Sequence, residues 1–178
     1  VDEFDNFIES NDLYDVIYAD KQYDHVLGAF RAARLSDKLR GTLREYLRVM
    51  TKPLAVHSSG LFEDSLNQPF AGVYSTYLVP NNHPDFGRRV RDVEDAIKLV
   101  HASIFSPESR AYFNAIDYMI EEEKMAVILQ EVIGNEHNGR YYPEISGVAQ
   151  SYNFYPFSYI QPEDGFAVTA IGLGAYVV

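Results

Sequence analysis

A short segment of the chain carries polar residues of the kinds that bind phosphate. The apolar run Leu54-Ala55-Val56 is followed directly by His57, Ser58, Ser59 and Gly60. Hydroxyls and backbone N–H groups of a loop with this composition can hold phosphate oxygens. A Ser-Ser-Gly loop is also common as an ordinary turn, so the residues alone leave two interpretations, a phosphate-binding loop and a simple turn.

Carboxylates follow at Glu63 and Asp64, and such groups can hold a hard divalent cation that bridges phosphate oxygens. The chain contains no cysteine, and its histidines show no His-x-x-x-His spacing, so we predict no metal site of that kind. The histidines other than His57 are interpreted as surface or half-buried helix residues (His25 and His101) and as turn residues (His83 and His137).

The elements that must position this segment follow from hydrophobic periodicity. Apolar residues recur at helical spacing in residues 4–50, and Ser36 stands where an N-cap is expected. Lys52-Pro53 ends the helical period, and residues 54–56 are predicted to form a short buried strand. Residues 60–69 are predicted to form a loop, and the alternation in residues 72–79 predicts a second strand.

Helices and strands alternate in the rest of the chain. The 3-4 spacing of apolar residues predicts a helix over residues 85–105, and Pro107 is expected to open another helix that ends near residue 119. Residues 125–133 are predicted to form a buried strand, residues 134–139 a turn, and residues 145–155 and 166–171 two further strands. We therefore predict an α+β fold, with a mixed sheet, flanking helices and a helical N-terminal segment, residues 1–52.

Composition narrows the classes of partner. The 178 residues carry 15 basic and 26 acidic side chains, a net charge of −11, which disfavours a nucleic-acid partner. The basic residues Arg88, Arg89, Arg91 and Lys98 alternate with acidic ones and are interpreted as a solvated helix face. No apolar run is long enough to span a bilayer as a helix, and the acidic start does not resemble a signal peptide. We expect no membrane partner and a cytoplasmic location.

Two other clusters have a functional and a structural interpretation. The glutamates at positions 121–123 are expected to be a solvated helix end. The second cluster is aromatic and forms either a partner surface or part of the core or sheet, of which we favour the latter. Its members are Tyr152, Phe154, Tyr155, Phe157 and Tyr159.

The order of several motifs resembles the nucleotide-binding domain of phosphoenolpyruvate synthase and pyruvate phosphate dikinase. In that family a strand ending Ala-Val-Arg-Ser-Ser precedes a Glu-Asp pair and a Phe-Ala-Gly turn, as residues 55–59, Glu63-Asp64 and Phe70-Ala71-Gly72 do here. Later motifs follow in the family's order. They are Ala102-Ser103-Ile104-Phe105-Ser106, Leu129-Gln130-Glu131-Val132-Ile133, Ser146-Gly147-Val148 and Gly172-Leu173-Gly174.

This resemblance implies an ATP-grasp-like domain over residues 53–178, in which two α+β lobes hold ATP with Mg²⁺ at its phosphates. In the full enzymes the domain phosphorylates a histidine of a mobile carrier domain, which delivers the phosphate to pyruvate at a barrel domain. We expect a fragment that does not complete this reaction alone. The chain starts without methionine, stops within the apolar run Tyr176-Val177-Val178, and lacks the family's Gly-Gly-Lys segment and its carrier and barrel domains.

The resemblance also suggests site residues. His57 stands at the family's phosphate-contacting arginine position and is the candidate catalytic residue, with Ser58 and Ser59 beside it as ATP-binding residues. Gln130, and the residues that follow it, fall where the family lines the adenine pocket, although a core strand with Gln130 at its rim is an equal alternative. The full adenine set is Gln130, Glu131, Val132 and Ile133.

Departures from the family pattern favour a weakened or repurposed site. His57 replaces an arginine, Ala175 replaces a glutamate that resembles a magnesium-site residue, and residues 149–154 lack a second basic residue. The leading hypothesis is part of the ATP-binding domain of a phosphoenolpyruvate synthase-like phosphotransferase. The alternative is a catalytically degenerate regulatory or interaction module, and a third interpretation is an acidic domain without a small-molecule site.

Overall fold

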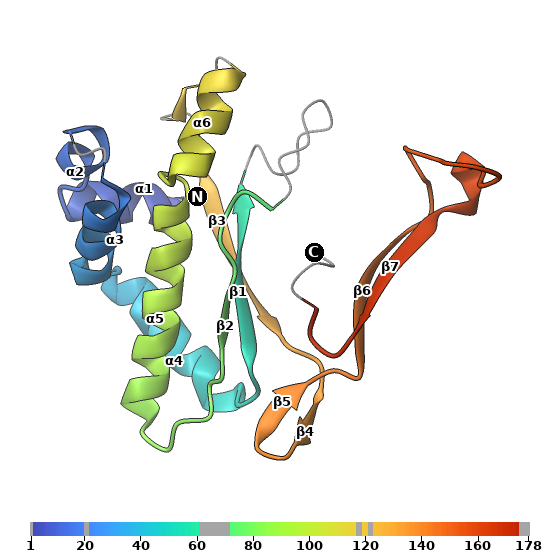
Figure 1. Ribbon diagram of the computed structural model, residues 1–178. Helices are drawn as coiled ribbons and strands as arrows, with labels where there is room; N and C mark the ends of the chain where they lie inside the picture. Colours follow the sequence, from blue (N-terminus) through green and yellow to red (C-terminus); the bar gives the residue numbers. More distant parts are fainter. Residues whose placement is uncertain (1, 20–21, 61–71, 117–118, 121–122, 175–178) are drawn as a thin grey trace. The chain divides into compact units, whose positions relative to one another are not determined.

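A computed structural model of the chain describes residues 2–19, 22–60, 72–116, 119–120 and 123–174. The chain divides into two compact units, Val1–Glu131 and Val132–Val178. Figure 1 gives the order of the helices and strands in each unit. Helices and small antiparallel sheets make up the structure, so the predicted α+β class is confirmed.

The first unit begins with the predicted helical segment. Its helices are α1 (Asp2–Ser10), α2 (Tyr14–Ala19), α3 (Tyr23–Ala32), α4 (Asp37–Val49), α5 (Phe86–Ser103) and α6 (Pro107–Ala115). The predicted N-cap is confirmed, because the Ser36 side chain accepts a hydrogen bond from the Leu39 amide at 3.1 Å. Helix α6 is shorter than predicted, since Ile116 leaves the helical conformation with φ −104° and ψ 6°.

A three-stranded sheet in the order β2-β1-β3 completes this unit, with β1 (Leu54–Gly60), β2 (Tyr77–Val79) and β3 (Met125–Glu131). The prediction that a loop begins directly after Val56 is wrong, because the strand continues to Gly60. His57 pairs with Ile128 and Gly60 pairs with Met125, so the polar residues continue the strand. Strand β2 covers only the end of the predicted residues 72–79. Every strand pairing in the described residues is antiparallel, which corrects the mixed sheet that we expected.

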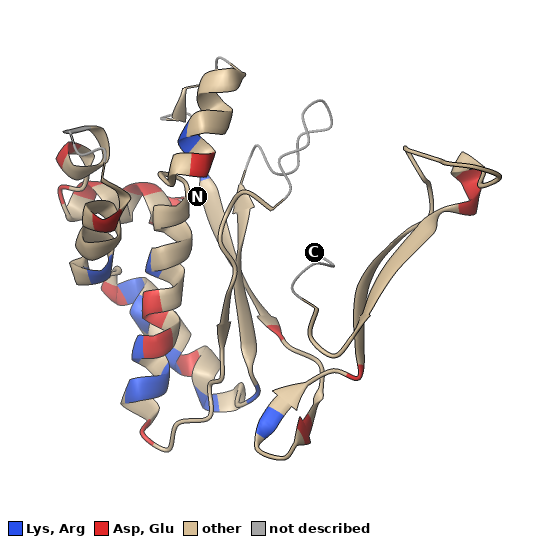
Figure 2. Ribbon diagram, viewed as in Figure 1, with Lys and Arg blue, Asp and Glu red and all other residues tan. Residues whose placement is uncertain are grey.

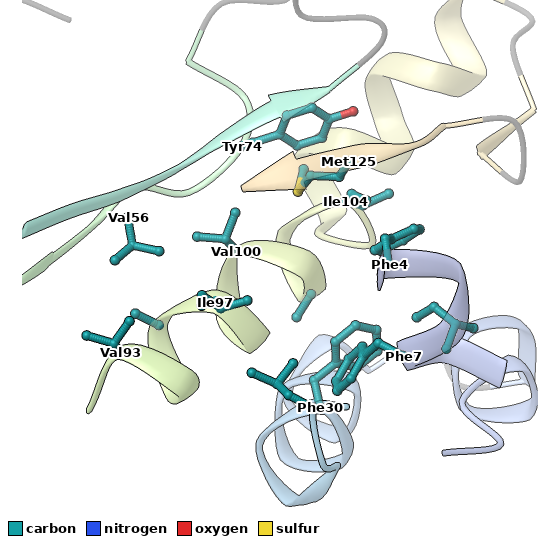
Figure 3. Close-up of a cluster of buried hydrophobic side chains, with 14 of the residues drawn as sticks. Phe4, Phe7, Phe30, Val56, Tyr74, Val93, Ile97, Val100, Ile104 and Met125 are labelled. Carbon is teal, nitrogen blue, oxygen red and sulfur yellow. The ribbon is translucent and has the colours of Figure 1, made fainter. Parts of the chain in front are cut away.

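The core lies between this sheet and the helices. Figure 3 shows Val56 and Met125 of the sheet on the side where Val93 and Val100 of α5 lie, and each of these side chains is at most 2% exposed. The apolar stripe predicted for α5 is buried throughout. A hydrophobic face of a helix against one face of a sheet is the expected way for both to remove apolar surface from water.

The motif Ala102-Ser103-Ile104-Phe105-Ser106 has a structural explanation. The Ser103 hydroxyl donates to the carbonyl oxygen of Val100 at 2.7 Å and accepts from the Ser75 amide at 3.1 Å. Ser106 caps α6, because its hydroxyl oxygen accepts from the Ser109 amide at 3.1 Å. These buried serines turn the chain from α5 into α6, so the motif stabilises a helix junction.

Basic residues recur along α5 (blue in Figure 2), and their contacts divide them into two groups. Arg88 and Arg91 form exposed ion pairs with aspartates, as a solvated face predicts. Arg89 instead donates to main-chain oxygens at the end of α4 at 2.8 and 2.6 Å. Lys98 is 7% exposed and donates at 2.6 Å to a main-chain oxygen at the end of α3. The prediction of a solvated face is therefore wrong for Arg89 and Lys98, whose cations cover the C-terminal ends of helices.

Two predicted surface positions are buried. Of the three glutamates, Glu121 and Glu122 lie outside the described residues, whereas Glu123 is 2% exposed rather than solvated. His101 is 4% exposed, and its ring packs against Phe4 and Phe7 with centroid distances of 5.0 and 5.6 Å. Burial lowers the pKa of the His101 imidazole to about 3, so His101 is a neutral core residue.

The second unit consists of two hairpins. Strands β4 (Asn135–His137) and β5 (Arg140–Tyr142) form the first hairpin, and strands β6 (Ile145–Gln150) and β7 (Phe166–Ile171) form the second. Only Asn138 and Gly139, with φ of 53° and 78°, form the turn that we predicted over residues 134–139, so His137 lies in a strand. Strand β7 has its predicted bounds, whereas β6 ends earlier than predicted.

The aromatic cluster of residues 152–159 does not pack in a strand or in the core. It lies between β6 and β7, and its side chains range from 44% exposed at Tyr152 to 86% exposed at Tyr159. Our preference for core or sheet packing is wrong, and the partner-surface interpretation stays a prediction. No helix in the described residues has both the length and the hydropathy needed to cross a membrane.

Replacing Gly60 tests the tight end of strand β1. A Cβ at this position would lie 2.5 Å from Glu123 Oε1 and 2.9 Å from a ring carbon of Tyr74, so Gly60→Ala should cost about 1–3 kcal/mol. Gly41→Ala in α4 is the control, since no atom lies within 4 Å of the added Cβ and alanine favours helix by up to about 1 kcal/mol. Urea denaturation followed by circular dichroism measures both, and equal stability of the two variants would contradict the packing.

The buried His101 predicts a pH dependence of stability. Its folded-state pKa of about 3 lies below the ordinary 6.5, so between these values the unfolded chain binds a proton that the folded chain does not. The free energy of unfolding should therefore fall as pH decreases through this window, by at most about 1.4 kcal/mol per pH unit from this group. Urea midpoints measured against pH for the wild type and for His101→Phe should show a shallower slope in the variant. Equal slopes, or an NMR titration of His101 above pH 5, would contradict a buried neutral imidazole.

Candidate functional site

The candidate site is built on the face of the β2-β1-β3 sheet that lies opposite the helices. Along β1 burial alternates strictly, with Leu54, Val56, Ser58 and Gly60 buried and the residues between them half-buried. Side chains of a strand point alternately to its two faces, so the helices cover the face of Val56. We call the opposite face the open face. Its residues are Ala55, His57 and Ser59 of β1, Leu78 of β2, and Ala126, Ile128 and Gln130 of β3.

Strand register places these side chains in rows across the open face. Ala55 lies between Leu78 and Gln130, and the next row along the strand is the pair His57 and Ile128. Leu78 is 52% exposed and Ile128 is 42% exposed. Directly opposite residues in an antiparallel pair have Cβ atoms about 4.5–5.5 Å apart, so the imidazole lies beside an apolar neighbour. The face therefore combines apolar surface with a few polar groups.

The structure separates residues that are adjacent in the sequence motif. His57 and Ser59 share the open face, whereas the Ser58 side chain is 6% exposed and belongs to the helix-covered face. A ligand on the open face can therefore contact the main chain of Ser58 but not its hydroxyl. A phosphate held by both hydroxyls, as the loop interpretation assumed, is incompatible with a regular strand at this position.

One hydrogen bond determines which nitrogen of His57 faces outward. The Nδ1 atom lies 3.1 Å from the carbonyl oxygen of Ser58. A carbonyl oxygen only accepts, so Nδ1 carries the hydrogen and donates. In the neutral ring the other nitrogen, Nε2, is then an acceptor.

The open face carries no permanently charged side chain among the described residues. The charged residue of β3 is Glu131, which ends the strand and is paired in register with buried Leu54. Its carboxylate forms an ion pair with Lys52 at 2.8 Å. Nowhere in the described ranges do three His, Asp or Glu side chains come together as a metal site requires. Of the described residues on this face, only His57 can therefore carry a charge.

The residues predicted to line an adenine pocket are distributed over two units. Gln130 is exposed and on the open face, in the same strand row as Ala55. Glu131 is the last residue of β3, and its carboxylate forms an ion pair with Lys52. Val132 and Ile133 belong to the second unit, where the Val132 carbonyl accepts from the Tyr141 hydroxyl at 3.1 Å and Ile133 is 73% exposed.

Several motif residues fall outside the described residues. They are Glu63, Asp64, Phe70, Ala71 and Ala175.

Two later motifs, separated in the sequence, are joined in the second unit. The Ser146 hydroxyl donates to the Gly172 carbonyl oxygen at 2.7 Å and accepts from the Gly174 amide at 2.9 Å. Gly172 has a φ of 79°, a conformation that favours glycine. A Cβ on Gly147 would collide with the Val168 carbonyl oxygen of β7. The Ser-Gly-Val and Gly-Leu-Gly motifs therefore form one local structure. The Ser146 hydroxyl joins the two motifs, and Gly147 leaves room for the main chain of β7.

Sequence reasoning missed Leu78 and Ile128 as part of the candidate site. The sequence held no signal for Ile128, because this residue is as apolar as its neighbours Val127 and Leu129. Such a continuous apolar run, residues 125–133, predicts a buried strand. Burial in β3 instead alternates toward its end, since only one face of the strand packs against helices.

Comparison with known families and proteins adds a match and a negative result. The family model described as the AMP/ATP-binding domain of pyruvate phosphate dikinase matches residues 1–178, the whole chain. No curated protein matches the chain.

The Ser146 hydroxyl can be tested without any ligand. Ser146→Ala removes the acceptor of the Gly174 amide, so that amide should exchange with deuterium faster, and the unit should lose about 1–2 kcal/mol. Ser151→Ala is the matched control, because Ser151 is exposed and follows the same strand. Hydrogen exchange measured by NMR reports both variants. Unchanged protection of Gly174 in Ser146→Ala would show that the hydroxyl does not join the motifs.

Proposed function

Because the chain belongs to the pyruvate phosphate dikinase AMP/ATP-binding domain family, we propose that the open face of its β2-β1-β3 sheet is part of an ATP site. One observation carries this proposal. His57, Ser59 and Gln130, which the resemblance to the family suggests as phosphate and adenine contacts, all lie on that face. The helices cover the opposite face of the sheet (Figure 1).

Each residue has a role that follows from its side-chain chemistry. The Ser59 hydroxyl and the His57 imidazole contact phosphate oxygens, and Ser58 contributes main-chain groups only. Gln130 presents an amide, which both donates and accepts, to the adenine edge. Main-chain groups of Glu131 pair with the base whatever its side chain. Residues 53–178 form the ATP-grasp-like part in this proposal.

The activity to which this site contributes is ATP-dependent phosphoryl transfer, through a carrier histidine to pyruvate, in a cytoplasmic enzyme related to phosphoenolpyruvate synthase. Catalysis of phosphoryl transfer depends on positioning and on stabilising charge at the phosphates. Mg²⁺ supplies part of that charge in such enzymes. The described residues contain no group of three His, Asp or Glu side chains that would hold this ion.

A second candidate function is a regulatory or interaction module that keeps the fold without catalysis. The observation that favours it is the absence of permanent charge on the open face within the described residues. A histidine there cannot replace the bidentate, always charged guanidinium of arginine. Under this alternative, nucleotide binds weakly and no phosphoryl group is transferred.

Restoring an arginine tests where the phosphates bind. His57→Arg places a permanent cation on the open face and should increase the affinity for Mg-ATP about tenfold. His83→Arg changes the net charge equally at an exposed position before α5 and should leave affinity unchanged. Isothermal titration calorimetry measures all three proteins. No heat of binding for either the wild type or His57→Arg at millimolar Mg-ATP would contradict an ATP site on this face.

An added carboxylate tests the same face from strand β3. Ile128→Glu sets a negative charge opposite His57 and should weaken ATP binding at least about tenfold through repulsion of the phosphates. Val49→Glu adds the same charge at an 82% exposed position of α4 and is the control. Equal ATP affinities of the two variants, measured by the same calorimetry, would remove the nucleotide from the open face.

A further inference from the structure

The His57 ring has a fixed orientation with an unusual consequence for an anion. Its Nδ1–H donates to the Ser58 carbonyl oxygen, so Nε2 is the nitrogen left for a ligand. In the neutral ring Nε2 carries a lone pair and accepts hydrogen bonds. Phosphate oxygens are also acceptors. The neutral imidazole therefore turns an acceptor toward the group that the site is proposed to bind.

Protonation reverses this interaction. The imidazolium carries hydrogens on both nitrogens, so Nε2 becomes a charged donor while the bond from Nδ1 to Ser58 is kept. Charge-assisted hydrogen bonds to phosphate are about twice as strong as neutral ones. A single proton thus converts His57 from a group that repels phosphate into one that attracts it.

The surroundings of His57 leave this proton as the main control of charge. From β3 it is faced by Ile128, with Ala126 and Gln130 on either side, and from β2 the open face presents Leu78. Its own strand contributes Ala55 and Ser59 to the face. None of these described neighbours titrates near neutral pH or carries a charge, and the pair Lys52–Glu131 lies at the end of the sheet where Glu131 is paired with Leu54.

We propose that His57 is a proton-dependent phosphate contact, which binds the phosphates of a nucleotide through Nε2 only as the imidazolium. This inference rests on the proposed ATP site and specifies its regulation. Phosphate binding then takes up one proton, and linkage makes protonation and phosphate affinity favour each other equally. A nucleoside without phosphates gains nothing from the proton. The preference of the site for ATP over adenosine therefore increases as pH falls.

Calorimetry on the whole chain with ATP and with adenosine, between about pH 8.5 and about pH 5.5, tests the proposal. The ratio of ATP affinity to adenosine affinity should rise about tenfold as pH falls in the wild type. The phosphates of ATP titrate in the same range, so His57→Arg, with its permanent charge, supplies the baseline for the ligand. Buffers of different ionisation enthalpy should show more proton uptake per ATP in the wild type than in His57→Arg, by up to about one proton.

The possible outcomes distinguish a failure of the proton-dependent contact from a failure of the ATP site. If ATP and adenosine both bind, and the wild type and His57→Arg share one pH profile, the proton-dependent contact is wrong and the ATP site stands. If neither ligand binds either protein at any pH, the ATP site itself is wrong.

NMR of the histidine ring gives a readout that needs no variant. In the free protein the ¹⁵N shifts should show hydrogen on Nδ1 and a lone pair on Nε2 of His57. At a fixed pH, ATP should increase the fraction of His57 rings that carry both hydrogens, adenosine should not, and the exposed His83 should respond to neither. A neutral ring with hydrogen on Nε2, or an equal effect of both ligands, would overturn the proposal.

Discussion

The pairing of strand β1 between β2 and β3 is the interaction on which the rest of the structure depends. Hydrogen bonds on both sides hold residues 54–56 extended, and the pleat then sends alternate side chains to opposite faces. The side chains of Leu54 and Val56 therefore pack in the core, on the side of the helices. His57 is thereby directed to the open face, and a slip of the register by one residue would bury it and expose the core side chains.

Helices were the most predictable part of the fold, because their apolar period and their caps are both local. The stripe of α5 and the Ser36 cap could be predicted for that reason. Strand ends were less predictable. Ser58 and Ser59 have loop-like composition, and only their pairing with β3, more than sixty residues away, makes them a strand. His101 was misassigned because its burial depends on Phe4 and Phe7 of a distant helix.

For the candidate site, the order of the motifs in the sequence was predictive of the family but not of the geometry. Motif order predicted the family, and the match over the whole chain confirms it. Order could not show that Ser59 shares a face with His57 while Ser58 does not, since that distinction follows from strand period and burial. Nor could it show that Ser146 holds the Gly172 turn, which depends on the pairing of β6 with β7. Several motif residues serve the fold, and the open face retains few groups for chemistry.

The central claim is that nucleotide binds on the open face and not on the core side of the same strands. Adjacent residues of β3 report on the two faces, since Ile128 lies on the open face and Leu129 packs against the core. Methyl NMR spectra recorded during an ATP titration measure both at once. We predict that the Ile128 methyl signals shift in proportion to bound ATP while those of Leu129 stay in place. Equal shifts at both residues, or a shift at Leu129 alone, would contradict the account.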